Sequence, residues 1–417
     1  MRRLMTVLTL SFLCSVANAI AANAQNIVGV SRSATLSAAQ INSRARTAFG
    51  ASLPRTTRAV EMFKVRYNSR DERGRRVVLS GLLALPRGGA PKGLVVFNHG
   101  TTADRAASPS RFKGESKASE TSLAMLAFAS GGYAVAMPDY LGLGDHGGAH
   151  PYPLGSINAR AAIDIISPAR EIMVRSGEES GSRLFVTGYS EGGAVSMWTV
   201  RVLERENKSD LRVFSAAHLS GPYDLSGVTR QSLLSPTSKA EEFVPRLYLL
   251  ANMVFYDHKS RGTRLTNYFK PAMANTVSNA FGRNVSDKNI IKRLALTATL
   301  MRANNRLDRV LDARFLRALQ TNDSRNFVIR ALKQNDTFSW SPRTPMLLVA
   351  LQNDSIVTSQ NTTKTLRAMR ARGVGANVAR QFIIRDEKLN HITAVAPALL
   401  AARRFFDGGF AVVQGAQ

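Results

Sequence analysis

Cysteine is almost absent from this chain, because Cys14 is the only one among 417 residues. Cys14 lies in a segment that we expect to be removed, so the mature protein would have neither a disulfide nor a thiol nucleophile, and packing alone must stabilise it. The proportions of 44% hydrophobic and 20% charged residues argue against a disordered, collagen-like or polytopic membrane protein. A chain of this length has room for a catalytic domain with a large insertion.

Acidic residues are also few, since 29 Asp and Glu stand against 56 Lys and Arg, which gives a formal net charge of +27. A nucleic-acid binder would need basic clusters interleaved with aromatic residues, or a recognition motif, and the basic residues here are scattered. We therefore expect no specific nucleic-acid partner. The expected consequence of the charge is a weak attraction to anionic membrane or envelope surfaces.

The first 24 residues have the pattern of a cleaved secretory signal. Arg2 and Arg3 follow the first methionine, residues 4–16 form a short apolar run, and small-x-small sites end at Ala19 and Ala24. The apolar run is too short to cross a bilayer. We predict a signal peptide over residues 1–24 and a periplasmic or secreted mature protein.

Apolar runs of strand length alternate with helical patterns along most of the chain. We expect strands at 60–67, 77–85, 94–97, 133–137, 184–187, 214–218, 346–351 and 382–384. We expect helices at 119–130, 157–175, 192–206, 359–371 and 392–406, and further helical stretches at 243–256 and 294–315. This alternation predicts a mostly parallel central sheet with helices on both faces.

Two segments depart from the alternation. Residues 25–58 are polar and helix-prone, which predicts a helical N-terminal arm. Residues 225–342 contain helical stretches but no clear strand, and a structureless loop of that length is uncommon. We therefore expect a helical cap, or lid, over 225–342, inserted into a catalytic domain made of residues 59–224 and 343–417.

The strongest motif surrounds Ser190, in the run Gly188-Tyr189-Ser190-Glu191-Gly192. An expected strand runs directly into this motif and an expected helix follows it at once. A serine on such a sharp turn has an exposed hydroxyl, and Gly188 and Gly192 permit the close approach of neighbouring backbone. The pattern predicts a nucleophile elbow with Ser190 as the nucleophile. An ordinary glycine-rich turn is the alternative.

A serine hydroxyl needs a base, and His391 is the histidine in the expected place. On this architecture the chain order is serine, then an acid, then a histidine after the last strand, and only His391 of the six histidines fits that order. The acid that orients the imidazole would be Asp354, which follows the expected strand 346–351. Asp224 and Asp386 are rival carboxylates, which we interpret as turn or capping residues.

Acyl transfer also needs donors directed at the developing oxyanion. We expect one of these donors to be the backbone N–H of Glu191. The second would come from the turn after the third expected strand, where Gly100 lets the Thr101 N–H face the serine. Thr102 could help through its side chain, and we interpret His99 as structural.

We expect neither a metal nor an organic cofactor. Asp145, His146 and His150 lie close together in a glycine-rich loop, but their spacing matches no zinc or calcium loop, so we interpret them as polar loop residues. The apolar stretch 247–255 would either line an acyl pocket or form the core of the insertion.

These motifs resemble those of the α/β-hydrolase superfamily and, more narrowly, of secretory lipases related to fungal lipase A and their bacterial esterase relatives. The resemblance is carried by residues 98–101, 133–144, 150–152, 188–193 and 220–224, by Asp354 with Val357, and by His391. It implies an α/β-hydrolase fold, a triad of Ser190, Asp354 and His391, and a helical cap over the acyl site. Many relatives carry Gln in place of Glu191. Because a carboxylate beside the forming oxyanion would be unfavourable, we expect that of Glu191 either to point elsewhere or to be partly protonated.

The expected function is the hydrolysis of carboxylic esters by an exported serine esterase or lipase. Its substrates would be small-molecule or lipid esters with short to medium acyl chains, cleaved through a serine-acyl intermediate. A serine exopeptidase is an alternative, because exopeptidases share this fold and triad. A non-catalytic basic envelope protein that binds polyanions is a third hypothesis, and the order of the triad argues against it.

Overall fold

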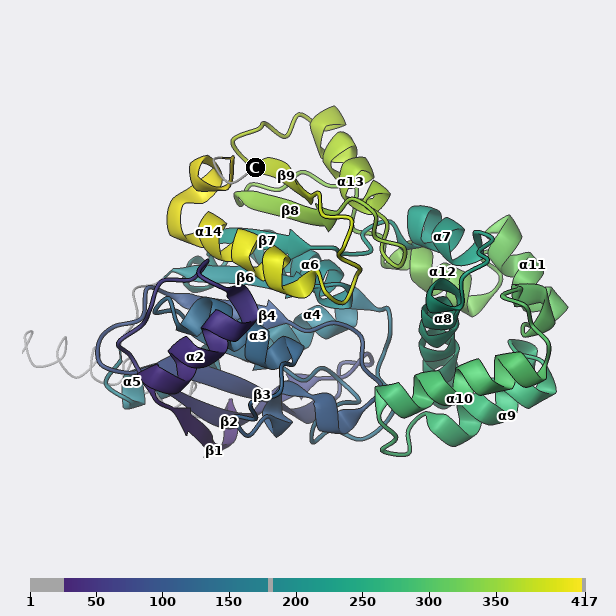
Figure 1. The fold of residues 1–417 in the computed structure, drawn as a ribbon, viewed down its shortest axis with the longest axis horizontal. Coiled ribbons are helices and arrows are strands. Elements are labelled where there is room, and N and C mark those ends of the chain that lie inside the picture. The colour runs from purple at the N-terminus through teal and green to yellow at the C-terminus, as the bar shows by residue number, and fades with distance from the viewer. Residues whose placement is uncertain (1–25, 179–182, 415–417) are drawn as a thin grey trace, which may run out of the picture.

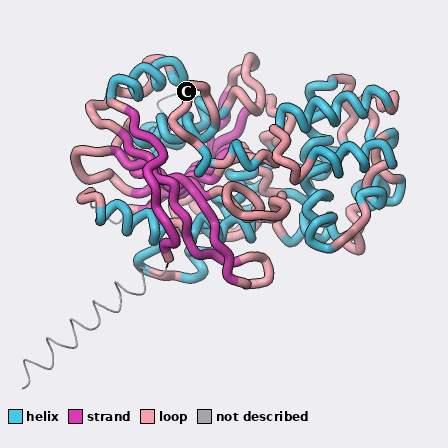
Figure 2. The backbone as a smooth tube through the Cα atoms, turned by 90° about the horizontal axis from the view of Figure 1, so that it is seen from below, coloured by secondary structure: helices cyan, strands magenta, loops and turns pink. Residues whose placement is uncertain are grey.

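The computed structural model describes residues 26–178 and 183–414 (Figure 1). The expected signal peptide, residues 1–24, lies outside the described residues. A part that contains the sheet and a part made of helices lie side by side (Figures 1 and 2). Within the described residues, none of the helices combines the length and apolarity that crossing a bilayer requires.

One nine-stranded sheet organises the larger part, in the order β1-β2-β3-β5-β4-β6-β7-β8-β9. Its strands are β1 (Ile27–Leu36), β2 (Val60–Arg70), β3 (Arg76–Pro86), β4 (Leu94–Asn98), β5 (Ala134–Pro138), β6 (Leu184–Tyr189), β7 (Val213–Leu219), β8 (Met346–Leu351) and β9 (Ala379–Ile384). The pairs from β1 to β5 are antiparallel, and all pairs from β5 to β9 are parallel. The expected mostly parallel sheet is confirmed.

Helices cover both faces of the sheet because successive residues of its central strands point to opposite sides. In β4, Val95 and Phe97 belong to one hydrophobic core, and Leu94 and Val96 belong to the other. The first core includes residues of α2 (Ala38–Phe49), α3 (Glu120–Ala129) and α14 (Val395–Gln414). The second includes residues of α4 (Gly155–Asp164), α5 (Ile166–Arg175), α6 (Glu191–Glu206) and α13 (Gln360–Ala371). Figure 1 shows α2 and α14 in front of the sheet.

The N-terminal arm differs from the expectation, and the prediction of a helical arm over 25–58 is wrong for its first part. Ile27–Leu36 form the edge strand β1, antiparallel to β2, and only Ala38–Phe49 form an α-helix. An edge strand pairs through its backbone and leaves many side chains in solvent, so polar residues are tolerated there. Ser37 then begins α2 with a capping box that it shares with Gln40.

Residues 225–342, which we call the cap, form helices around a hydrophobic core of their own. These helices are α7 (Arg230–Leu234), α8 (Ala240–Arg261), α9 (Pro271–Ala280), α10 (Asp287–Leu300), α11 (Ala313–Thr321) and α12 (Phe327–Gln334). The helical stretch expected over 294–315 is interrupted between α10 and α11. Arg302, Asn304 and Asn305 have positive φ in that interval, a conformation that ends a helix.

Candidate active site

Ser190 lies at the sharp turn between β6 and α6, with φ 56° and ψ −121°. A positive φ strains a residue that carries a Cβ, and this strain is typical of a nucleophile elbow. The turn also needs glycines, because a Cβ on Gly188 would collide with the Gly192 backbone and one on Gly192 would collide with the Asn98 carbonyl. The Ser190 side chain caps no helical N–H. Its hydroxyl therefore remains available for another partner.

Three side chains that are far apart in the sequence meet at this turn. Ser190 Oγ lies 2.8 Å from His391 Nε2, and His391 Nδ1 lies 2.6 Å from Asp354 Oδ2. The side chain of Asp354 is 0% exposed and that of His391 is 6% exposed. Backbone N–H groups of Ile356 and Val357 each donate to Asp354 Oδ1 at 2.9 Å, which fixes the carboxylate against the imidazole.

The loop between β9 and α14 is held so that its histidine faces the elbow. The hydroxyl of Tyr189, the residue before Ser190, donates to the backbone oxygen of His391 at 2.5 Å. The backbone N–H groups of Ile392 and Thr393 donate to the Asn390 side chain at 3.0 Å each. The imidazole is therefore positioned by its own loop and by the neighbour of the serine.

The two rival carboxylates have other partners. Asp224 pairs with Lys364 and accepts a hydrogen bond from Val228 N at the start of a helical turn. Asp386 accepts a bond from Lys388 N. These contacts are those of turn and capping residues, as expected from the sequence.

The loop after β4 packs against the elbow, since an added Cβ on Gly100 would lie 3.5 Å from the Tyr189 carbonyl oxygen. Gly100 N donates to Glu120 Oε1 at 2.8 Å, and Ala103 N donates to Asp287 Oδ1 at 2.9 Å. Among the hydrogen bonds of residues 26–178 and 183–414, none uses the Thr101 amide. The loop is therefore anchored on both sides of an amide that has no acceptor among the described residues.

The side chain of Glu191 is buried beside the elbow with two polar partners. Asn158 Nδ2 donates to Glu191 Oε1 at 3.0 Å, and His150 Nε2 lies 2.8 Å from the same oxygen. These contacts hold the Glu191 carboxylate in place. The backbone N–H of Glu191 is at the first position of α6 and therefore has no intrahelical acceptor. Sequence reasoning missed both partners. Residues 150–152 were noted only as part of the family resemblance, and nothing in that stretch indicates a contact between His150 and Glu191.

The histidine-containing loops contribute packing and polar contacts around the site. His99 stacks on Tyr140 with ring centroids 4.2 Å apart, and Tyr140 stacks on His150 at 5.7 Å. Burial lowers the pKa of His99, which favours a neutral, structural ring.

Asp145, His146 and His150, the residues considered as metal ligands, each contact a different partner. His146 Nδ1 accepts a bond from Gly142 N at 3.1 Å, and Asp145 pairs with Lys64 at 2.7 Å. The third member, His150, points to Glu191. No group of three or more His, Cys, Asp and Glu residues suited to a metal occurs in the described part of the chain.

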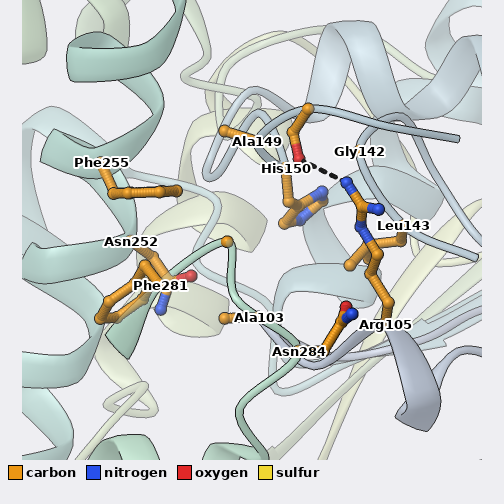
Figure 3. A pocket seen from close by; sticks show the side chains of 12 residues that line it. Ala103, Arg105, Gly142, Leu143, Ala149, His150, Asn252, Phe255, Phe281 and Asn284 are labelled. Atoms are coloured by element: carbon orange, nitrogen blue, oxygen red, sulfur yellow. Dashed lines mark hydrogen bonds between the residues drawn. The ribbon is translucent and has the colours of Figure 1, made fainter. Parts of the chain in front are cut away.

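A small pocket lies between the cap and the loops that surround the elbow (Figure 3). Asn252 and Phe255 of α8 reach it from the cap, and His150 reaches it from the opposite side. Arg105 borders the pocket and donates to Gly148 O at 3.2 Å, the dashed line in Figure 3. The cavity of about 20 Å³ is close to the volume of one water molecule. Asn252 and Phe255 line this pocket, and most of the stretch 247–255 is buried in the cap core.

Part of the chain is similar to a known protein family. The sequence model of the secretory lipase family matches residues 108–232, a segment that contains the elbow. A search of curated proteins gave no match.

Solved structures share the fold over nearly the whole chain. A protein from Legionella pneumophila is 22% identical, with a TM-score of 0.78, and the match covers 92% of this chain and 97% of that one. The ligand-bound rice cell wall degrading esterase LipA from Xanthomonas oryzae is 22% identical, with a TM-score of 0.75 and coverage of 94% and 97%. Candida antarctica lipase A is 15% identical, with a TM-score of 0.64 and coverage of 92% and 82%.

The resemblance that the motifs indicated is confirmed by these matches. The secretory lipase match supports the expectation of a carboxylic-ester hydrolase, and the structural neighbours show the fold. The chain has the α/β-hydrolase fold of these proteins, and its residues 108–232 match the secretory lipase family.

Proposed function

We propose that this chain is an exported serine hydrolase that cleaves carboxylic esters through a serine-acyl intermediate. The observation that carries the proposal is the hydrogen-bonded row from Ser190 through His391 to Asp354, with distances of 2.8 and 2.6 Å. These distances are within the range that proton transfer to a general base requires. The pattern of residues 1–24 and the match to secretory lipases support export.

In the first half of the reaction, the Ser190 oxygen bonds to the ester carbonyl carbon while its proton passes to His391 Nε2. Asp354 accepts a hydrogen bond from Nδ1 and stabilises the resulting imidazolium. The tetrahedral intermediate collapses when the bond to the alcohol oxygen breaks. His391 returns its proton to that oxygen, which leaves the acyl group on Ser190.

The backbone N–H groups of Thr101 and Glu191 would stabilise the oxyanion of the tetrahedral intermediate. In the described part of the chain neither amide has an acceptor, which supports this role: the Thr101 amide lies between two anchored residues, and the Glu191 amide begins α6. Donors held in place before the reaction lower the barrier because they need no reorganisation as charge develops.

In the second half of the reaction, water replaces the alcohol. A water molecule attacks the acyl carbon and gives a proton to His391, which then passes it to Ser190 as the acid is released. We propose that the preferred substrates carry short to medium acyl groups.

The proposal is tested by the variant Ser190→Ala with p-nitrophenyl butyrate as substrate. We expect kcat to fall by about 10⁴-fold or more, because the nucleophile of the triad is lost. Asp386→Asn, in the same loop as His391, is the matched control and should retain wild-type activity. If a folded Ser190→Ala protein retained most of its activity, the assignment of Ser190 as the nucleophile would be refuted. A hydrolysis rate that rises steadily from acetate to palmitate esters would refute the preference for short to medium acyl chains.

A further inference from the structure

We propose that Asp287 of the cap is a positioning residue for the oxyanion hole, and this inference rests on the proposed esterase function. Asp287 holds the loop after β4 in the arrangement in which the Thr101 amide can serve a reacting ester. The cap would then contribute to the chemical step as well as covering the site.

The Asp287 carboxylate makes three hydrogen bonds, two of them to the loop after β4 (residues 99–104), which we call the oxyanion loop. Its Oδ2 accepts a bond from Thr102 Oγ1 at 2.6 Å, and its Oδ1 accepts one from Ala103 N at 2.9 Å. The third bond comes from the Tyr248 hydroxyl of α8, which donates to Oδ1 at 2.6 Å. The phenol oxygen in turn accepts a longer bond of 3.1 Å from Ala103 N. Two cap helices, α8 and α10, therefore converge on two consecutive loop residues.

The other side of the loop is anchored by the sheet part of the molecule. Glu120, the first residue of α3, accepts a bond from Gly100 N at 2.8 Å. Thr101 lies between Gly100 and Thr102, so the carboxyl groups of Glu120 and Asp287 hold the segment that carries its amide from both sides. Removing Asp287 would leave the Thr102 side of the loop held to the cap, within the described residues, only by the 3.1 Å bond from Ala103 N to the Tyr248 hydroxyl. A displacement of about 1 Å in a catalytic group can cost roughly 100-fold in rate.

A purely structural role for Asp287 is the competing explanation, because an acidic residue in the first turn of a helix stabilises that helix. Ser286 separates the two explanations. It is the N-cap of the same helix, and its side chain accepts a bond from Asn289 N. Ser286→Ala therefore weakens α10 without removing a contact to the oxyanion loop.

The experiment measures kcat and KM of the full-length variants Asp287→Ala, Asp287→Asn and Ser286→Ala with p-nitrophenyl butyrate. We expect Asp287→Ala to lower kcat by about 10- to 100-fold with KM changed less than about twofold, because oxyanion contacts strengthen only in the transition state. Asp287→Asn keeps one acceptor oxygen and should be intermediate. Ser286→Ala should lower the melting temperature and leave kcat at the wild-type value.

A second readout uses a trifluoromethyl ketone, which forms a tetrahedral adduct with the serine. Its inhibition constant should rise in Asp287→Ala by the same factor by which kcat/KM falls. If Asp287→Ala does not fold, Thr102→Val removes the shortest bond to the loop and should give the same change in smaller degree.

Three results would overturn the inference. These are an unchanged kcat in folded Asp287 and Thr102 variants, a loss confined to KM, and an equal loss of kcat in Ser286→Ala. A wild-type protein that hydrolyses no ester would instead refute the proposed function, and the inference with it.

Discussion

Glu120 shows how one side chain can serve the site and also make stability depend on pH. Burial raises the pKa of its carboxyl from 4.5 to about 8, the Gly100 N–H lowers it to a smaller extent, and the nearby Glu191 charge raises it. The folded chain therefore keeps a proton that the unfolded chain loses near pH 4.5. Because the folded state binds more protons between these values, the contribution of Glu120 to stability falls as the pH rises from about 4.5 to 8.

The variant Glu120→Gln tests this prediction, because its amide stays neutral at every pH. We expect the melting temperature of the variant, relative to wild type, to increase between pH 5 and pH 8 and to level off above that range. Thermal unfolding in one buffer series measures both proteins. A difference that stays constant over this interval would contradict the raised pKa.

Single residues were predictable where a strand and a turn marked their position. Ser190 and His391 follow strands in the order that the fold requires, and Asp354 follows β8 by three residues. No strand or turn in the sequence indicates the role of Asp287 or Glu120, because their partners in the loop after β4 are 184 and 20 residues away. The polar partners of a site depend on tertiary contacts that no local pattern encodes.

At the scale of elements, the close approach of β6, α6 and the end of β4 makes the elbow intolerant of extra atoms. A Cβ on Gly192 would collide with the Asn98 carbonyl, which is backbone and cannot rotate away. We expect Gly192→Ala to lower the free energy of unfolding by about 1–3 kcal/mol, measured by urea denaturation.

The matched control for this prediction is Gly29→Ala in the edge strand β1. No heavy atom lies within 4 Å of a Cβ added there, so the change should be neutral or slightly stabilising. Equal effects of the two substitutions would show that the elbow is less tightly packed than the structure indicates.

The elements themselves were predictable to different degrees. The strands β4 to β8 are short, mostly apolar runs in which all residues but Phe214 are buried. The sequence patterns indicated each of them to within two residues at either end. The edge strand β1 exposes many of its side chains, so its polar composition suggested a helix. Backbone pairing at a sheet edge imposes little on the side chains, which explains why the strand was missed.

At the scale of the whole molecule, the proposed reaction gives no reason for the net charge of +27. We propose that it gives the protein a weak attraction to anionic surfaces. The mature protein should sediment with phosphatidylglycerol vesicles at low salt and should be released by 0.5 M NaCl, at which concentration the Debye length is only about 4 Å. Equal binding to neutral phosphatidylcholine vesicles, or binding that resists salt, would contradict an electrostatic origin.

The division into a sheet part and a helical cap also belongs to this scale. The absence of strand patterns over 225–342 indicated helices there, and the structure shows them packed around their own core. The contacts between Asp287 and the oxyanion loop join the two parts, and composition could not indicate them. The packing of one unit against another depends on side chains brought together only by the complete fold.

The central claim is that Ser190 forms a covalent acyl intermediate with His391 as its base. Mass spectrometry of peptides from the protein, after reaction with a fluorophosphonate, tests this claim most directly. We predict one adduct, on the peptide that contains Ser190, with labelling abolished in Ser190→Ala and at least about 100-fold slower in His391→Ala. An unlabelled Ser190 in active protein, or an adduct on another residue that accounts for the loss of activity, would contradict the account.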